Sequence, residues 1–131
     1  MLKDLLTPLC TELSLPIPPL ENETQCSLSI NDDTKIFFRS DNEKLFLKCS
    51  LIPCPLQNRE TLFLNLMKAN LLGESTGGGV IGLDEEEKFL TLSIILPYEL
   101  DYQAFRESVE DFVNFVVYWR KEIERVSKSV S

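Results

Sequence analysis

The chain has 131 residues, of which 44% are apolar and 26% charged, a balance typical of one globular domain. Its 21 acidic residues outnumber 13 basic ones, so the net charge is −8, and there is no histidine. An acidic surface repels nucleic-acid phosphates and anionic lipids, and the lack of histidine removes Ser–His and Cys–His catalytic pairs. We therefore expect no nucleic-acid binding, no membrane binding, no enzyme activity, no metal and no cofactor.

The four cysteines, Cys10, Cys26, Cys49 and Cys54, include no C-x-x-C pair. This spacing favours buried, reduced thiols over zinc ligands or disulfides. The N-terminal stretch lacks the long apolar region of a signal peptide, and no run reaches the roughly 18–20 apolar residues of a membrane span. Together these features predict a cytoplasmic protein.

Residues 2–14 carry leucines at helical spacing, which predicts an amphipathic helix. Pro8 interrupts this pattern and leaves two alternatives. Either the helix kinks at Pro8, or Thr7 caps a shorter helix in which Pro8 takes the first position. The proline-rich residues that follow predict an extended connector.

Three strand patterns come next, over residues 26–30, 34–39 and 44–51, and polar turns separate them. Such closely spaced strands predict an antiparallel meander. In the third strand, apolar residues alternate with mostly polar ones, and one face carries Leu45, Leu47, Cys49 and Leu51. Phe37 and Phe46 fall among the polar positions, which raises the question of their exposure.

The second half predicts a helix over residues 59–72, with Asn58 as its N-cap and Gly73 at its C-terminus. A glycine-containing loop leads to strands at 80–83 and 88–96, joined by an acidic turn at 84–87. Asp101 then caps a last helix, whose apolar residues recur every three or four positions: Phe105, Val109, Phe112, Val116, Trp119, Ile123 and Val126. The tail, 127–131, is predicted to be disordered.

The predicted order is α-β-β-β-α-β-β-α, with no regular alternation of strand and helix. This order indicates the α+β class, with an antiparallel twisted sheet flanked by helices. We expect a single domain over residues 1–131.

Residues Gly77–Gly82 match the pattern G-x-G-x-x-G, but here a helix precedes the glycines and a strand follows. A dinucleotide site needs the opposite order, so the loop is interpreted as a connector. The run Asp84–Glu87 lacks the ligand spacing of a calcium loop and is interpreted as a solvated hairpin tip. What remains is an acidic, non-catalytic domain suited to binding an extended peptide.

Several features in order then resemble the class I type III secretion chaperones, the Tir chaperone family. These features are the N-x-x-G that ends a helix at Asn70–Gly73, the glycine loop, Gly82-Leu83-Asp84, Leu96-Pro97, and the run from Phe105 to Glu110 and Phe112. The resemblance covers essentially the whole chain and is most specific over residues 62–120.

The resemblance implies a small bacterial cytoplasmic homodimer that holds the N-terminal region of a secreted effector in extended form and keeps it soluble and competent for secretion. The alternative is a regulatory adaptor of the same fold, possibly one half of a chaperone heterodimer, which binds a gating or transcription protein. Neither role implies a nucleotide or another cofactor.

Two sets of apolar residues are therefore candidate binding sites. Those expected to contact the effector, because they are apolar and partly exposed, are Leu2, Leu5, Leu6, Leu9, Phe37 and Phe46. Those expected at the dimer interface, from the resemblance and from their apolarity, are Leu62, Leu66, Val80 and Ile81.

Overall fold

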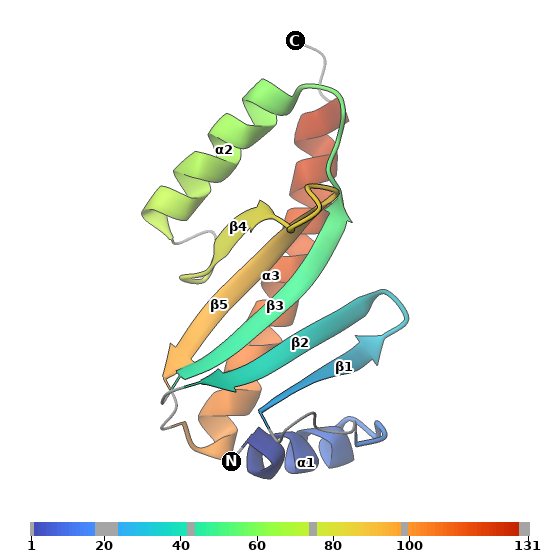
Figure 1. The fold of residues 1–131 in the computed structure, drawn as a ribbon, viewed down its shortest axis with the longest axis vertical. Helices are drawn as coiled ribbons and strands as arrows, with labels where there is room; N and C mark the ends of the chain where they lie inside the picture. The colour runs from blue at the N-terminus through green and yellow to red at the C-terminus, as the bar shows by residue number, and fades with distance from the viewer. Residues whose placement is uncertain (1, 18–23, 42–43, 74–75, 98–99, 129–131) are drawn as a thin grey trace. The chain divides into compact units, whose positions relative to one another are not determined.

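The fold is that of a computed structural model, which describes residues 2–17, 24–41, 44–73, 76–97 and 100–128 (Figure 1). Its elements are α1 (Leu2–Glu12), β1 (Gln25–Asn31), β2 (Thr34–Asp41), β3 (Lys44–Pro53), α2 (Arg59–Leu72), β4 (Val80–Leu83), β5 (Phe89–Pro97) and α3 (Tyr102–Lys128). The strands hydrogen-bond in the order β1-β2-β3-β5-β4. The predicted α+β class and the order of its elements are confirmed.

The chain forms two compact units. The first comprises Met1–Cys49 and Ile94–Glu110, and the second comprises Ser50–Ser93 and Asp111–Ser131. Strands β3 and β5 and helix α3 each contribute residues to both units.

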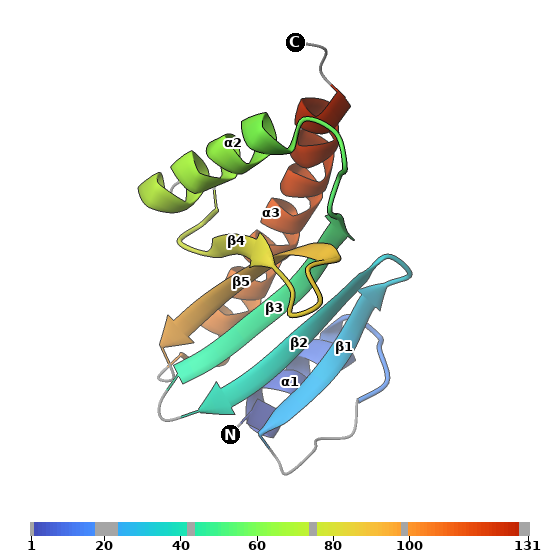
Figure 2. The ribbon, with the colours of Figure 1, turned by 45° about the horizontal axis from the view of Figure 1, so that its top comes forward.

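In the first unit, the meander buries one side of each strand because side chains alternate between the two faces of a sheet. Its buried face carries Cys26, Leu28, Ile36, Phe38, Leu45, Leu47 and Cys49. Figure 2 shows α1 lying on one side of β1 and β2. The start of α3 contributes Phe105, whose ring centroid lies 6.1 Å from that of Phe38.

Helix α1 continues through Pro8, so the alternative of a shorter helix capped by Thr7 is wrong. A proline inside a helix costs about 3 kcal/mol, because it removes one backbone hydrogen bond and crowds the preceding turn. Burial of a large aliphatic side chain contributes about 1.5–3 kcal/mol. The five buried residues of α1 offset the cost of the proline: Leu2, Leu5, Leu6, Leu9 and Cys10.

The end of α1 is fastened to the start of α3. The Tyr102 hydroxyl donates a hydrogen bond to the Glu12 carboxylate, and the Arg106 guanidinium pairs with the same carboxylate at 2.9 Å. These two hydrogen bonds lower the pKa of Glu12 below its ordinary value of 4.5. Desolvation and the hydrogen bond to Glu12 raise the pKa of Tyr102 to about 12.

In the second unit, α2 begins after Asn58 and ends before Gly73, as predicted. Asn58 takes the N-cap position as predicted, and its carbonyl accepts the Leu62 N–H at 3.0 Å, but its backbone is left-handed (φ 56°) and its side chain makes no cap hydrogen bond. The side-chain amide donates instead to the Ser127 carbonyl at 2.9 Å. Gly73 has the left-handed conformation expected of it (φ 75°), and its N–H donates to the Ala69 carbonyl.

Helix α3 is capped as predicted, because the Asp101 carboxylate accepts the Ala104 N–H at 2.8 Å. All seven residues of its predicted apolar seam are buried. The helix extends to Lys128, where Lys128 pairs with Glu124 at 2.6 Å, so the prediction of a disordered tail is wrong for residues 127 and 128. Residues 129–131 lie outside the described part of the chain.

The glycine loop also belongs to the second unit. A Cβ atom at Gly77 (φ 66°) would lie 2.5 Å from the Phe115 ring, and one at Gly79 would lie 2.5 Å from the Ser93 carbonyl oxygen. Both glycines are therefore explained by close approach of the backbone to its neighbours.

Of the described helices, none is long and apolar enough to cross a membrane.

Candidate binding surfaces

The four leucines of α1 that the sequence assigned to effector binding are buried in the first unit. Leu2, Leu6 and Leu9 are almost inaccessible, and Leu5 is 9% exposed. The expectation that they are partly exposed is wrong, because the whole apolar stripe of this helix packs inward. An effector could reach them only after a rearrangement, so their role in binding stays a prediction.

The other two candidates, Phe37 and Phe46, lie on the opposite side of the meander and are half-buried. They share this side with charged residues. Arg39 stands directly opposite Phe46, with its guanidinium carbon 5.0 Å from the ring centroid, and Phe37 stands opposite Lys48. We define the meander outer face as Lys35, Phe37, Arg39, Phe46 and Lys48.

A groove of about 480 Å³ runs along β1 in the first unit, and its lining combines the residues after α1 with most of the strand: Leu15, Pro16, Ile17, Ser27, Leu28, Ser29, Ile30, Asn31 and Asp32. Since β1 is the first strand in the sheet order, one of its edges has no partner strand among the described residues. Ile17 is 54% exposed and offers apolar surface beside this edge. Sequence reasoning did not identify this groove, because no local pattern reveals which strand ends a sheet.

The predicted interface residues of the second unit divide into two groups. Leu62, Leu66 and Ile81 are buried within the chain, whereas Val80 is 54% exposed. The buried residues present almost no surface to another molecule, and only Val80 lies at the surface as the prediction required. The apolar pattern alone could not tell which side of the helix faces inward.

Helix α2 nevertheless carries a second apolar stripe. Leu64 lies about 200° around the helix from Leu62, and Met67 and Leu71 follow it at spacings of three and four residues. All three are exposed, and Leu71 is 85% exposed. We define the α2 outer face as Leu64, Met67 and Leu71. Sequence reasoning missed this stripe, although it is visible as the i, i+3, i+7 spacing of these residues.

Asn70 fastens β4 to α2. Its side-chain oxygen accepts the Ile81 N–H at 2.8 Å, and its side-chain nitrogen donates to the Ile81 carbonyl at 2.9 Å. An asparagine amide fits this double contact because it carries a donor and an acceptor side by side. The contact holds the backbone of β4 beside α2, so that Val80 and α2 are positioned together.

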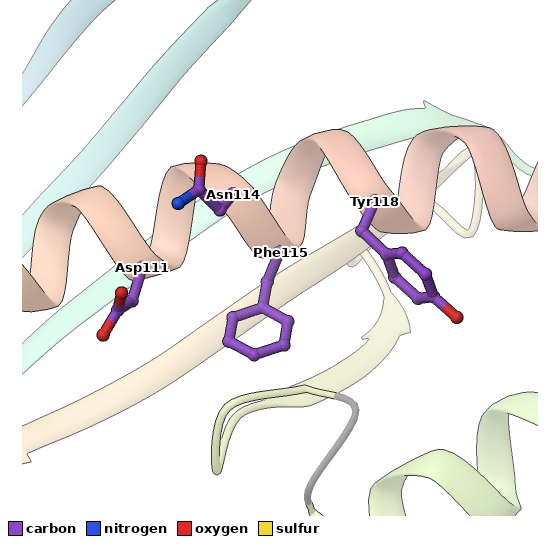
Figure 3. A pocket seen from close by; sticks show the side chains of 4 residues that line it. All are labelled: Asp111, Asn114, Phe115 and Tyr118. Carbon is purple, nitrogen blue, oxygen red and sulfur yellow. The ribbon is translucent and has the colours of Figure 1, made fainter.

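A shallow hollow of about 380 Å³ lies along α3 in the second unit, lined by Asp111, Asn114, Phe115 and Tyr118 (Figure 3). The Phe115 ring points from α3 toward the glycine loop, where it covers Gly77. Its described lining places one carboxylate, one amide and one phenol around the Phe115 ring.

Three of the four cysteines are buried, and Cys54 is half-buried. Burial raises the pKa of Cys10, and burial with the neighbouring Cys10 thiol raises the pKa of Cys26 to about 11. Thiols of this kind are protonated and poorly nucleophilic at neutral pH. Within the described residues, no three His, Cys, Asp or Glu side chains gather as metal ligands.

A strand edge beside an apolar groove, a mixed aromatic and basic sheet face, and a helix that is apolar on both sides are the features of a protein-binding domain. The chain belongs to the Tir chaperone protein (CesT) family, whose profile matches residues 4–120. The resemblance to the class I type III secretion chaperones is thus confirmed.

One relative is a Chlamydia pneumoniae protein, CPj0713/CpB0740, which is 34% identical over 86 residues. The match covers 64% of this chain and 64% of the length of that relative.

Three solved complexes contain a similar fold. The ExsC–ExsE complex matches with a TM-score of 0.79 at 18% identity, over 92% of this chain and 91% of the other. Yersinia pestis SycH, a type III secretion chaperone in complex with a fragment of YscM2, matches with a TM-score of 0.69 at 16% identity. This match covers 90% of this chain and 98% of the solved chain. The ExoU–SpcU complex of Pseudomonas aeruginosa matches with a TM-score of 0.68 at 12% identity, over 98% of this chain and 98% of the solved chain. At these identities the likeness shows the fold alone.

Proposed function

We propose that this protein is a type III secretion chaperone, which binds the N-terminal region of a secreted effector in extended form in the bacterial cytoplasm. The observation that carries the proposal is the groove along β1. Membership of the Tir chaperone family supports the same role, and the complexes of similar fold each pair two different proteins.

The groove offers two kinds of contact to an extended peptide. The outer edge of β1 provides backbone N–H and C=O groups, which pair with any strand regardless of its sequence. Ile17 and the half-buried Ile30 provide apolar surface for alternate side chains of that strand. Backbone pairing and a few apolar contacts distribute the binding energy over many weak interactions along the peptide. Such binding suits a client that must be released before secretion.

The experiment is a complex of the whole chain with the N-terminal segment of a secreted protein encoded beside it, followed by hydrogen exchange of both partners. We expect slowed exchange of the amides of β1 and of one stretch of the client. In the source bacterium, deletion of the chaperone gene should reduce secretion of that protein. Slowed exchange elsewhere, with none along β1, would contradict the proposed site.

A matched pair of variants tests the apolar part of the groove. Ile17→Gln should weaken client binding, because Ile17 lines the groove. Leu56→Gln should leave binding unchanged, because Leu56 is an exposed apolar residue that does not line this groove. If the bound protein is a gating or transcription protein that is itself not secreted, the regulatory adaptor becomes the better reading.

We also propose that the protein is a homodimer, with the α2 outer face and Val80 at the interface. Helix α2 carries apolar stripes on two sides, and among the described residues only the stripe of Leu62, Leu66 and Ala69 is buried. An apolar stripe of a helix is usually covered, so the stripe that is left exposed favours a partner. The buried residues Leu62, Leu66 and Ile81 would support this interface from beneath. A stable interface buries on the order of 1,600 Å² in total. A heterodimer with a second chaperone would use the same face.

A further inference from the structure

The meander outer face has a charge opposite to that of the chain as a whole. On this side of β2 and β3 the strands place four basic residues, Lys35, Arg39, Lys44 and Lys48, and only one acidic residue, Asp41. The chain carries 13 basic residues against 21 acidic ones. About a third of its basic residues are thus gathered on one side of two strands, where β1 adds the neutral Gln25, Ser27 and Ser29.

Aromatic and basic side chains alternate on this face in both directions. Along β2, Phe37 is followed two residues later by Arg39, and along β3, Phe46 is followed by Lys48. Across the strands, Phe37 pairs with Lys48, and Arg39 pairs with Phe46. Each ring therefore has a basic neighbour on two sides, and the guanidinium of Arg39 lies over the Phe46 ring.

This arrangement sets the spacing of a matching ligand. Diagonal neighbours on an antiparallel pair lie about 7–8 Å apart, which is the relation of Arg39 to Lys48. Side chains two residues apart on an extended chain are about 6.5–7 Å apart. Two carboxylates at positions i and i+2 of an extended segment thus match the two basic groups, and apolar side chains nearby match the rings.

We propose that the meander outer face binds an extended client segment in which carboxylates alternate with apolar side chains. The inference rests on the proposed chaperone function and adds a preference for acidic clients to it. The preference runs against the net charge of −8, which by itself would favour a basic segment. A preference for acidic peptides would therefore indicate binding at this face, whereas a preference for basic peptides would indicate attraction by the net charge of the whole chain.

A basic face with half-buried aromatic rings also resembles a platform for single-stranded nucleic acid. The observations favour a peptide, because two carboxylates at positions i and i+2 of an extended segment match the spacing of Arg39 and Lys48 across the two strands.

The test uses two synthetic peptides of about twelve residues, in which valine and phenylalanine alternate either with glutamate or with lysine. Binding to the whole chain is followed by fluorescence anisotropy at low salt. We expect the glutamate peptide to bind at least about tenfold more tightly than the lysine peptide, with the difference shrinking as salt is added. The double variant Arg39→Gln/Lys48→Gln should abolish this preference.

The control is the double variant Lys3→Gln/Lys121→Gln, which changes the net charge equally at two exposed helix positions and should retain the preference. Tighter binding of the lysine peptide would overturn the inference. Binding of a single-stranded RNA that is lost in the Arg39→Gln/Lys48→Gln variant would also overturn it. A change in oligomeric state in that variant would overturn it too, because it would identify a second copy of the chain as the occupant of this face. Equal binding of both peptides would overturn the charge preference and leave the chaperone function standing, whereas binding of neither would contradict both.

Discussion

The α2 outer face and the meander outer face both present apolar side chains, exposed in the first and half-buried in the second, and their chemistry differs. The α2 outer face consists of aliphatic side chains and methionine. The meander outer face sets each aromatic ring beside a basic group. An uncharged apolar face gains most from permanent burial, as in an obligate dimer. A charged and aromatic face stays soluble when empty, which suits a partner that comes and goes.

Helices α1 and α2 have similar apolar content but leave different amounts of it exposed. The leucines of α1 all point inward, so this helix supports the meander from one side and presents little apolar surface. Helix α2 buries Leu62 and Leu66 and still exposes Leu64, Met67 and Leu71. Apolar content alone thus does not identify an interface, because the number of covered sides decides what remains for a partner.

The largest effect is expected in the core that supports the meander outer face. Leu5→Asn should reduce the free energy of unfolding by about 2–5 kcal/mol, because it places an amide where a buried leucine packs. Chemical denaturation measures this loss. Phe46→Gln, at a half-buried position, should cost less stability and should weaken binding of the acidic peptide. Equal losses of stability in both variants would place Phe46 in the core as well.

The next effect concerns the α2 outer face. Leu71→Glu should weaken the dimer by about 2 kcal/mol or more, roughly 30-fold in the dissociation constant, because it puts a charge into an apolar interface. Sedimentation equilibrium measures the change. Leu56→Glu is a matched control, since Leu56 and Leu71 are both 85% exposed. A monomer at micromolar concentration before any substitution would contradict the interface directly.

A smaller effect is expected from Asn70, which links the two parts of the second unit. Asn70→Ala removes both hydrogen bonds to Ile81 and should cost about 1–3 kcal/mol of stability, because it leaves two backbone groups unpaired. Hydrogen exchange at Ile81 should rise. The dimer should weaken too, since Val80 is then held less firmly beside α2. Unchanged exchange at Ile81 would mean that β4 is positioned by other contacts.

The smallest effect is a dependence on pH in the first unit. The pKa of Glu12 is lowered by Tyr102 and Arg106, so its contribution to stability is present above about pH 4.5 and is lost as the pH falls through the lowered value. Glu12→Gln should therefore lower the melting temperature slightly at pH 7, and the difference from the unchanged chain should vanish in acid. The dimer should be unaffected. A difference that persists in acid strong enough to protonate this carboxylate in the folded chain would show that its charge is not the cause.

The sequence by itself determined the order of the elements, most of their bounds and the apolar seam of α3. Periodicity and turn chemistry are local properties, so Gly73 and Asp101 could be placed from their neighbours alone. The run of family features was equally readable, because it depends on residue order and not on contacts.

The tertiary structure decided which faces are covered. The side-chain contact of Asn58 could not be assigned from sequence, because its amide bonds to Ser127, far along the chain. The burial of Leu62, Leu66 and the α1 leucines was also hidden, since both sides of an apolar helix look alike until packing chooses one. The alternation of aromatic and basic side chains on the meander outer face could be seen only once the register of β2 and β3 was known. Pairing across a sheet is a non-local property, and no short stretch of sequence encodes it alone.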